Sequence, residues 1–446
     1  MKYKCSRFNF LHKCPNGELR MYNSMTGTKS LLMCKVKRSS SIYEMLHNGE
    51  VDEEALSPNE LETLLQKGYI VPKAYDESKA LELRKMSLLS SDKKLCIIIM
   101  PTEDCNFRCK YCYETFKKGR MSTEVQNAII RYVKKNIKEH TELNVIWFGG
   151  EPLDAVDIIE YLSKEFIKIC KTARKPYSSS ITTNGYNLTP DVYEKLYEYH
   201  VYGYQITLDG CQQQHDSQRV LKNGDGTFQK IVDNLVFIKE HYKRGTAFAI
   251  RTNFSKSIMA DIDNYLSFFK EAFGDDPRFS LFIQTVSDWG GERVASFHDE
   301  IILPSHAKVL NKLKEHEICL NMPGHCYGLD CSASICYAAK MSSVVIGSDG
   351  ILYKCTRDFE MAENQVGVLT PEGDLCLNDN WQLWLNRVAP KSEKCEGCFY
   401  EANCLRAVCP YGLVAGGKEI FCSPEKVNMG AFLEAFNTNL FTVMED

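Results

Sequence analysis

The chain has 446 residues, of which 44% are apolar and 25% are charged, proportions typical of a globular protein of two or three domains. Its formal net charge of −4 gives no general attraction to nucleic acid or an anionic membrane, and no apolar run approaches the roughly 20 residues that span a bilayer. Met1–Phe10 lacks the apolar core of a secretion signal, so we expect a cytoplasmic protein with no membrane partner and no nucleic-acid partner.

Cysteine is the exceptional residue in this composition. Twenty cysteines in a large chain without an export signal predict metal ligation rather than disulfides, because the cytosol keeps thiols reduced. Fourteen of them lie in two groups, at 105–112 and 319–422. We interpret the scattered cysteines, such as Cys5, Cys34 and Cys170, as small buried hydrophobic residues.

Residues 1–90 predict a small winged-helix-like module. Asn16-Gly17 lies between short mixed-polarity runs and suggests a β-hairpin, and Ser30–Val36 is strand-like. Two helices follow in the prediction: Ser41 caps the first, over Ile42–Asn48, and Pro58 stands in the first turn of the second. A hairpin with a further strand and short helices is a winged-helix arrangement.

Residues 91–316 alternate strand and helix patterns with a regular rhythm. This alternation predicts parallel βαβ units, and six units are too few for a closed eight-stranded barrel. We therefore predict an α/β fold, a partial (β/α)6 barrel whose chemistry lies at the C-terminal ends of its strands. The strand-like runs are Leu95–Met100, Val145–Phe148, Ser179–Thr183, Gly203–Leu208, Phe248–Asn253 and Ser280–Thr285.

Residues 317–446 break this rhythm and consist mainly of cysteines, glycines and short loops. A segment with so little apolar core needs bound metal to hold it together. The predicted domain organisation is therefore a module over 1–90, a partial barrel over 91–316 and a cysteine-rich domain over 317–446.

The first cysteine group follows the first predicted barrel strand directly. Cys105, Cys109 and Cys112 are spaced Cys-x3-Cys-x2-Cys, so three thiolates on one loop can hold three irons of a [4Fe–4S] cube and leave the fourth iron open. An open iron can chelate the amino and carboxylate groups of S-adenosylmethionine (SAM). A zinc site lacking its fourth ligand or a ferredoxin-like cluster fits this spacing less well.

This cysteine loop, placed after the first strand of a partial barrel, resembles the signature of the radical SAM superfamily. Gly149-Gly150-Glu151-Pro152 ends the second predicted strand, where the family contacts the SAM amino group; glycine permits close backbone approach and glutamate accepts from an ammonium. The resemblance implies cleavage of SAM to a 5′-deoxyadenosyl radical, with protein groups orienting the reactants. The residues that it implies for SAM contact are Gly149, Gly150, Glu151, Asn184, Thr207 and Arg219.

The second cysteine group resembles a SPASM domain, which carries two auxiliary [4Fe–4S] clusters in peptide-modifying radical SAM enzymes. The spacing departs from that family once, because four residues separate Cys404 from Cys409 where three are usual. Two zinc sites are the alternative, since Cys-x2-Cys is a common zinc pair. The resemblance implies one cluster on Cys395, Cys398, Cys404 and Cys422, and another on Cys336, Cys355 and Cys409, with Cys331, in reserve Cys326, or a substrate thiolate as the fourth ligand.

A winged-helix module before such a core resembles the recognition element with which maturases of ribosomally made peptides bind a precursor's leader. The leader would add a strand to the Ser30–Val36 edge, beside the helix that carries Leu61, Leu64 and Leu65. Such leucines are also typical of a core, and winged helices also bind DNA. The resemblance to thioether-forming sactipeptide and ranthipeptide enzymes implies three [4Fe–4S] clusters, SAM, a precursor peptide, and an electron donor such as flavodoxin or ferredoxin.

The predicted reaction is hydrogen abstraction from the precursor peptide followed by an intramolecular crosslink, with a cysteine thioether as the first choice. A carbon–carbon crosslink and the oxidation of Cys or Ser to formylglycine are alternatives within this class. Formylglycine enzymes lack the N-terminal module and have Asp directly after the cysteine equivalent to Cys355, where this chain has Thr356. The alternative of a different class is an iron–sulfur redox sensor with a DNA-binding head, which needs no SAM pocket.

Overall fold

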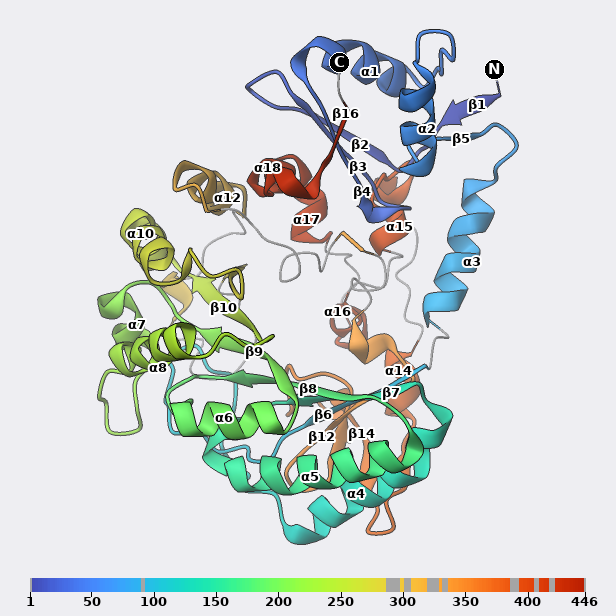
Figure 1. Ribbon diagram of the computed structural model, residues 1–446. Coiled ribbons are helices and arrows are strands. Elements are labelled where there is room, and N and C mark those ends of the chain that lie inside the picture. The colour runs from blue at the N-terminus through green and yellow to red at the C-terminus, as the bar shows by residue number, and fades with distance from the viewer. Residues whose placement is uncertain are drawn as a thin grey trace. The chain divides into compact units, whose positions relative to one another are not determined.

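The computed structural model of the chain (Figure 1) describes residues 2–89, 93–285, 297–300, 306–318, 329–330, 336–385, 393–404, 409–416 and 422–444. The chain divides into two compact units. The barrel unit contains 91–305 and 340–385, and the terminal unit contains 1–90, 306–339 and 386–446. Among the described helices, none is both long and apolar enough to cross a membrane.

Six parallel strands form the main part of the barrel unit, in the spatial order β11-β10-β9-β8-β7-β6. Each strand pairs with the one that precedes it in the chain, which is the arrangement that consecutive βαβ units produce. The predicted (β/α)6 order is confirmed. The strands are β6 (Lys94–Ile99), β7 (Glu142–Trp147), β8 (Tyr177–Thr183), β9 (Val201–Thr207), β10 (Ala247–Phe254) and β11 (Phe279–Thr285).

Helices between these strands pack on the outer side of the sheet (Figure 1). The first begins where the Ser122 hydroxyl accepts from Val125 N–H, and it buries one stripe of apolar side chains. Trp147, at the end of β7, stacks on Phe166 of the following helix with 6.4 Å between ring centroids. The helices are α4 (Thr123–Asn136), α5 (Val156–Ala173), α6 (Pro190–Glu198), α7 (Gln212–Gln218), α8 (Phe228–His241), α9 (Lys256–Ala260) and α10 (Ile262–Phe273).

Four further strands extend the sheet beyond β6. β12 (Ser343–Ile346) pairs with β6 in parallel, and β13 (Ile351–Tyr353), β14 (Gln365–Leu369) and β15 (Leu375–Leu377) continue as an antiparallel meander. Every residue of β12 is buried, so this pairing closes an apolar edge of the barrel. Residues 340–385 therefore group with the barrel by their contacts. The sequence pattern assigned them to the cysteine-rich domain over 317–446, and that domain boundary remains a prediction.

A four-stranded sheet in the order β16-β4-β3-β2 organises the terminal unit. β2 (Asn9–Lys13) and β3 (Leu19–Asn23) form the predicted hairpin, with Gly17 at a positive φ of 85° in its turn. β4 (Gly27–Cys34) is antiparallel to β3, and β16 (Thr442–Met444) is parallel to β4. A short pair, β1 (Tyr3–Cys5) with β5 (Ile70–Pro72), lies outside this sheet.

Helix α1 (Val36–Asn48) begins six residues earlier than predicted, and the expected cap at Ser41 is wrong. The hydroxyl of Ser41 instead donates to the Arg38 carbonyl oxygen inside the helix, a local bond that serine forms readily. The prediction for α2 (Pro58–Gln66) is confirmed: the Ser57 hydroxyl accepts from Glu60 N–H, and the Glu60 carboxylate accepts from Ser57 N–H. α3 (Glu77–Leu89) follows.

The strand that we expected to receive a leader is already paired on both sides. β16 covers its outer edge from Leu32 to Cys34, and the Asp330 carboxylate accepts from Thr28 N–H at 2.8 Å. On α2, Leu64 is fully buried in the core cluster of the module, and Leu61 and Leu65 pack against that cluster. These leucines therefore stabilise the core of the module, which was the alternative to leader contact in the sequence analysis.

Candidate active site

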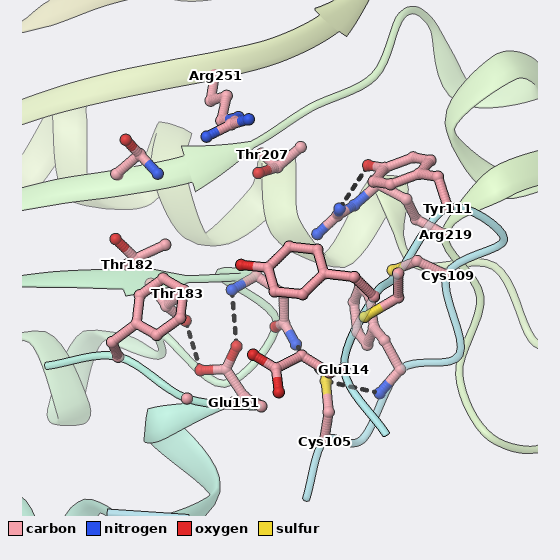
Figure 2. A pocket seen from close by; sticks show the side chains of 18 of the residues that line it. Cys105, Cys109, Tyr111, Glu114, Glu151, Thr182, Thr183, Thr207, Arg219 and Arg251 are labelled. Carbon is pink, nitrogen blue, oxygen red and sulfur yellow. Dashed lines mark hydrogen bonds between the residues drawn. The ribbon is translucent and has the colours of Figure 1, made fainter. Parts of the chain in front are cut away.

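A cavity of about 320 Å³ opens at the C-terminal ends of the barrel strands. All three cysteines of the first group and all six residues predicted to contact SAM line it. Figure 2 shows Cys105 and Cys109 on the loop at one side of the cavity, and Thr207 and Arg251 reaching in from the strands. The structure therefore brings together residues from five separate loops and strands that the sequence motifs singled out.

The cysteine loop is held in shape by backbone hydrogen bonds. Phe107 N–H donates to Cys105 Sγ at 3.3 Å. Arg108 N–H donates to the Val220 carbonyl oxygen at 2.8 Å, and Lys110 N–H donates to that of Gln218 at 2.9 Å. Gln218 is the last residue of helix α7 and Val220 follows it, so the fourth βα connection of the barrel fixes the loop that carries the thiols.

Burial dominates the electrostatics of these thiols. It raises the pKa of Cys112 to about 12, and it raises the pKa of Cys105 further, with the Glu151 carboxylate as the second cause. Cys105 and Cys112 therefore hold their protons until a cation takes their place, which is how iron ligation begins. The donor set fits the three-cysteine ligation of a [4Fe–4S] cluster with one open iron.

The Gly149-Gly150 turn is in close contact with the cysteine loop. Gly149 has a φ of 122°, and a Cβ there would lie 2.3 Å from the Thr102 carbonyl oxygen. A Cβ on Gly150 would lie 2.2 Å from the Asp104 carbonyl oxygen. The turn is pinned by Gly150 N–H, which donates to Thr102 O at 3.2 Å. Both glycines thus allow the end of β7 to touch the backbone that leads into Cys105.

Glu151 uses its carboxylate to join two neighbouring strand ends. Oε1 accepts from Leu153 N–H at 2.9 Å and from the Thr183 hydroxyl at 2.6 Å, and Oε2 accepts from Asn184 N–H at 2.7 Å. Burial raises the pKa of this carboxyl to about 7, and the hydrogen bonds from Asn184 and Thr183 act against that rise. Glu151 lines the cavity, and it also braces the loop after β7 against the loop after β8.

Arg219 belongs to a buried network that the motif analysis covered only in part. Its Nη1 donates to the Tyr111 hydroxyl at 2.7 Å, and the Tyr111 hydroxyl in turn donates to the Asp209 carboxylate. Asn253 Nδ2 donates to the same hydroxyl at 3.3 Å. Tyr111 directly precedes the third cysteine and Asp209 follows the fourth strand, so their positions in the sequence place both near the site. No sequence signal indicated Asn253.

Two polar side chains in the cavity were missed entirely. Glu114 directly follows the cysteine loop; burial raises the pKa of its carboxyl to about 8, and its Oε1 has no hydrogen-bond partner among the described residues. Arg251 lies on β10, where its Nε donates to Asn253 Oδ1 at 2.9 Å. The Nε of Arg219 is likewise buried without a partner in the described part of the chain. Unpartnered polar atoms around a cavity of this size fit a site built for a polar ligand.

Cys355, from the second cysteine group, lies close to the same cavity. Its neighbours Thr356 and Arg357 line the cavity wall, and Tyr113 of the cysteine loop donates its hydroxyl to the Thr356 carbonyl oxygen at 2.9 Å. The fully buried Asn364 shapes this loop, since its side chain accepts from Cys355 N–H and donates to the Cys355 carbonyl oxygen, both at 2.9 Å.

Three of the four cysteines predicted for the other auxiliary cluster share one neighbour in the terminal unit. Burial acts to lower the pKa of Lys426, but Cys422, Cys398 and Cys395 raise it, with Cys422 Sγ 3.2 Å from Nζ. Cys404, the fourth, ends α15 (Glu401–Cys404). Cys336 and Cys409 also belong to the terminal unit, and Cys331 and Cys326 lie outside the described residues.

Comparison with known proteins agrees with the geometry of the cavity. Residues 99–254 match the family model of the radical SAM superfamily. The chain is 29% identical over 202 residues to a cysteine-type anaerobic sulfatase-maturating enzyme of Clostridium novyi (strain NT), covering 43% of this chain and 51% of that enzyme. It is 26% identical over 203 residues to the radical SAM cyclopropyl synthase TigE of Paramaledivibacter caminithermalis, covering 40% of each. The matches thus span about half the length of these relatives.

Among solved structures, native anSMEcpe with bound AdoMet and Cp18Cys peptide superimposes with a TM-score of 0.57 at 18% identity, over 77% of this chain and 95% of that chain. This likeness shows a shared fold. The family match and the cysteine loop in the cavity agree with it: residues 99–254 of this chain are similar to the radical SAM superfamily.

Proposed function

We propose that the chain is a radical SAM enzyme that modifies a ribosomally made peptide and installs an intramolecular crosslink, with a cysteine thioether as the product. The observation that carries the proposal is the cavity, in which the three cysteines of one loop face the strand ends that carry the predicted SAM contacts. A redox sensor would need no such cavity. The competing non-enzymatic interpretation therefore leaves the arrangement of Thr207, Asn184 and Arg219 without a purpose.

In this proposal, Cys105, Cys109 and Cys112 hold a [4Fe–4S] cluster. With SAM bound, the cluster supplies a 5′-deoxyadenosyl radical that removes a hydrogen atom from carbon. The chain's own residues orient the reactants: Arg219, fixed by Tyr111, offers its guanidinium to the methionine or ribose of SAM, and the glycine turn admits the amino group.

The substrate class rests on the relatives and on the Cys355 loop. One relative is a sulfatase-maturating enzyme and another is a cyclopropyl synthase, and one solved structure of the same fold contains a bound peptide. Cys355, whose neighbours line the cavity, would hold part of an auxiliary cluster beside the substrate. Thr356 stands where formylglycine enzymes have Asp, which favours a crosslink over formylglycine formation. An external donor such as flavodoxin or ferredoxin would supply the reducing electron.

We place leader recognition in the terminal unit. Because β16 occupies the edge of β4 from Leu32 to Cys34, a leader that adds a strand there has to displace residues 442–444. Met444 is buried against the module core, whereas Val443 is 38% exposed, so a leader would replace one apolar contact and three residues of pairing. A chain truncated after Phe441 should bind the precursor peptide more tightly, and unchanged binding contradicts this placement.

The central experiment is anaerobic. We expect the reconstituted chain to hold about twelve irons, as three four-iron cubes require, and to convert SAM to 5′-deoxyadenosine when reduced. A triple Ala variant of Cys105, Cys109 and Cys112 should lose about four irons and all deoxyadenosine. The matched control replaces three barrel-unit cysteines that do not line the cavity, namely Cys96, Cys170 and Cys211. Zinc in place of iron, or iron without SAM cleavage, would contradict the proposal.

The product is tested with a short cysteine-containing precursor peptide, to be sought among the genes that neighbour this one. A thioether or a carbon–carbon crosslink removes two hydrogens from the peptide. One of them is transferred to deoxyadenosine, and deuterium at the abstracted position makes this transfer visible. Thiol alkylation after the reaction distinguishes the two crosslinks, because only a thioether consumes a cysteine. A peptide that instead gains an aldehyde would indicate formylglycine chemistry.

A further inference from the structure

A cluster of three metal-binding side chains lies in the terminal unit, among residues that no part of the radical chemistry uses. His12 comes from β2, Cys14 from the turn that follows β2, and Glu434 from α18 (Met429–Ala435). One ligand atom from each side chain lies within 4.8 Å of the others. Together they offer one nitrogen, one sulfur and one oxygen donor.

The local fold positions each donor. His12 pairs with Arg20 across the β2–β3 hairpin, so both side chains lie on the face that α18 covers. Arg20 Nη1 donates to the carbonyl oxygens of Leu433 and Glu434 at 2.7 and 3.2 Å, which fixes the C-terminal end of α18 on the hairpin. Cys14 closes the hairpin, donating its N–H to the Glu18 carbonyl oxygen at 2.8 Å.

The histidine ring is oriented by a close contact. A Cβ at Gly430 would lie 2.6 Å from His12 Nδ1, so α18 passes directly beside that edge of the ring. The opposite nitrogen, Nε2, lies 2.6 Å from Glu434 Oε1. The nitrogen that faces the carboxylate is therefore the one available to share a cation with it.

The surroundings are charge-balanced without a metal. The Cys14 side chain is buried, and burial raises the pKa of its thiol; Arg20 and Lys314 act to lower that pKa while Glu434 and Glu18 act to raise it. Lys314 Nζ also donates to the second carboxylate oxygen of Glu434. Glu18 Oε2 is buried and forms an ion pair with Arg20 Nη2 at 3.5 Å. A divalent cation would bind the Cys14 thiolate and Oε1 of Glu434. Oε2 of Glu434 would stay paired with Lys314.

We propose that His12, Cys14 and Glu434 form a zinc site that ties the β2–β3 hairpin to α18. Zinc takes nitrogen, sulfur and oxygen donors together in tetrahedral geometry, at about 2.0–2.3 Å from each ligand. Donor atoms in such a site lie roughly 3.3–3.8 Å apart, so the side chains have to move by about 1 Å. The fourth ligand is water, because the His12 and Glu434 side chains are 25% and 17% exposed. Binding releases the Cys14 thiol proton to solvent, and no electron is transferred.

The site would join segments 422 residues apart in the chain. A clip of this kind restrains the unfolded chain strongly because the loop that it closes is long. None of its three ligands is a cysteine predicted to hold an iron–sulfur cluster, so we expect its occupancy to be independent of SAM cleavage. Failure of the zinc proposal therefore leaves the proposed function untouched, and the reverse also holds.

The test uses the full, cluster-containing protein, washed with EDTA and analysed for zinc and iron together. We expect about one zinc per chain, and a Zn K-edge absorption spectrum with one sulfur and three nitrogen or oxygen ligands. The variants Cys14→Ser and His12→Gln should each lower zinc at least fivefold without changing the iron content. Cys170→Ser, at a buried cysteine of the barrel unit, is the matched control and should leave zinc unchanged.

Three outcomes overturn the proposal. Zinc with three or four sulfur ligands would identify empty cluster sites as its location. Zinc content that survives both variants, or absence of zinc after growth with zinc supplied, would show that His12, Glu434 and Lys314 form an ion-pair chain beside a buried cysteine. If Cys14→Ser fails to fold, Glu434→Gln provides the same readout from the helix side, with circular dichroism as the check on folding.

Discussion

Gly150→Ala tests whether close packing of the glycine turn places the cluster-binding loop. The new Cβ would lie 2.2 Å from the Asp104 carbonyl oxygen and 2.8 Å from that of Glu103, whereas ordinary contacts begin at 3.4 Å. Backbone atoms lie on both sides of the contact, so the loop has to retreat by about 1 Å, at a cost of about 1–3 kcal/mol. That loop leads directly into Cys105, and a displacement of about 1 Å in a catalytic group lowers rates by about 100-fold.

The assay compares iron content and the rate of 5′-deoxyadenosine formation under anaerobic conditions. Gly119→Ala is the matched control, since a Cβ there meets no atom within 4 Å. Like the cysteine loop, Gly119 lies in the connection between β6 and α4. We expect the control to stay within about twofold of the unaltered protein, because it creates no overlap. Full iron and an unchanged rate in Gly150→Ala would refute the reasoning that the turn positions the loop.

Three further predictions follow from buried hydrogen bonds. Glu151→Gln turns an amide donor toward the N–H of Asn184 or Leu153, so hydrogen exchange there should accelerate about 10- to 100-fold, whereas the exposed Glu198→Gln should have no effect. Tyr111→Phe removes the hydroxyl that holds Arg219, and SAM binding measured by equilibrium dialysis should weaken about 5- to 30-fold; unchanged affinity argues against the network. Hydrogen bonds from Arg38 lower the pKa of Glu60 below its usual 4.5, so Glu60 stabilises α2 above pH 4.5 and loses this contribution as the pH falls through the lowered value. Glu60→Gln should therefore lower the free energy of opening of residues 58–66 by about 1–2 kcal/mol at neutral pH, which speeds their hydrogen exchange. In acid, the difference from the unaltered protein should disappear.

The barrel was predictable because its signals are local. Strand and helix periods alternate over short distances, and β8 shows the strict alternation of buried and half-buried residues that such a period produces. The cysteine spacing of the first group is equally local, because all three thiols lie on one loop. The two adjacent glycines at Gly149-Gly150 are a local signal too, because glycine permits close backbone approach. The sequence did not show which backbone approaches, and the structure identifies it as that of Thr102 and Asp104.

Pairings between distant segments were not predictable in the same way. β12 joins β6 across almost 250 residues, and its short apolar run carries no mark of the strand that it will meet. β16 joins β4 over an even longer separation. The role of Glu151 was also hidden, because a motif indicates that a carboxylate is present but not that Leu153, Thr183 and Asn184 will surround it.

Backbone hydrogen bonds to neighbouring strand-to-helix connections support the shape of the first cysteine loop. Arg108 N–H bonds to the segment after α7, and Glu151 N–H donates to the Asp104 carbonyl oxygen at 2.9 Å. These are backbone hydrogen bonds within a packed sheet end, so they persist when the thiols are protonated. We therefore expect the backbone of the loop to keep its shape when the cluster is absent. Removing the cluster should accordingly leave the barrel folded, with exchange protection at Glu151 retained while SAM cleavage is lost.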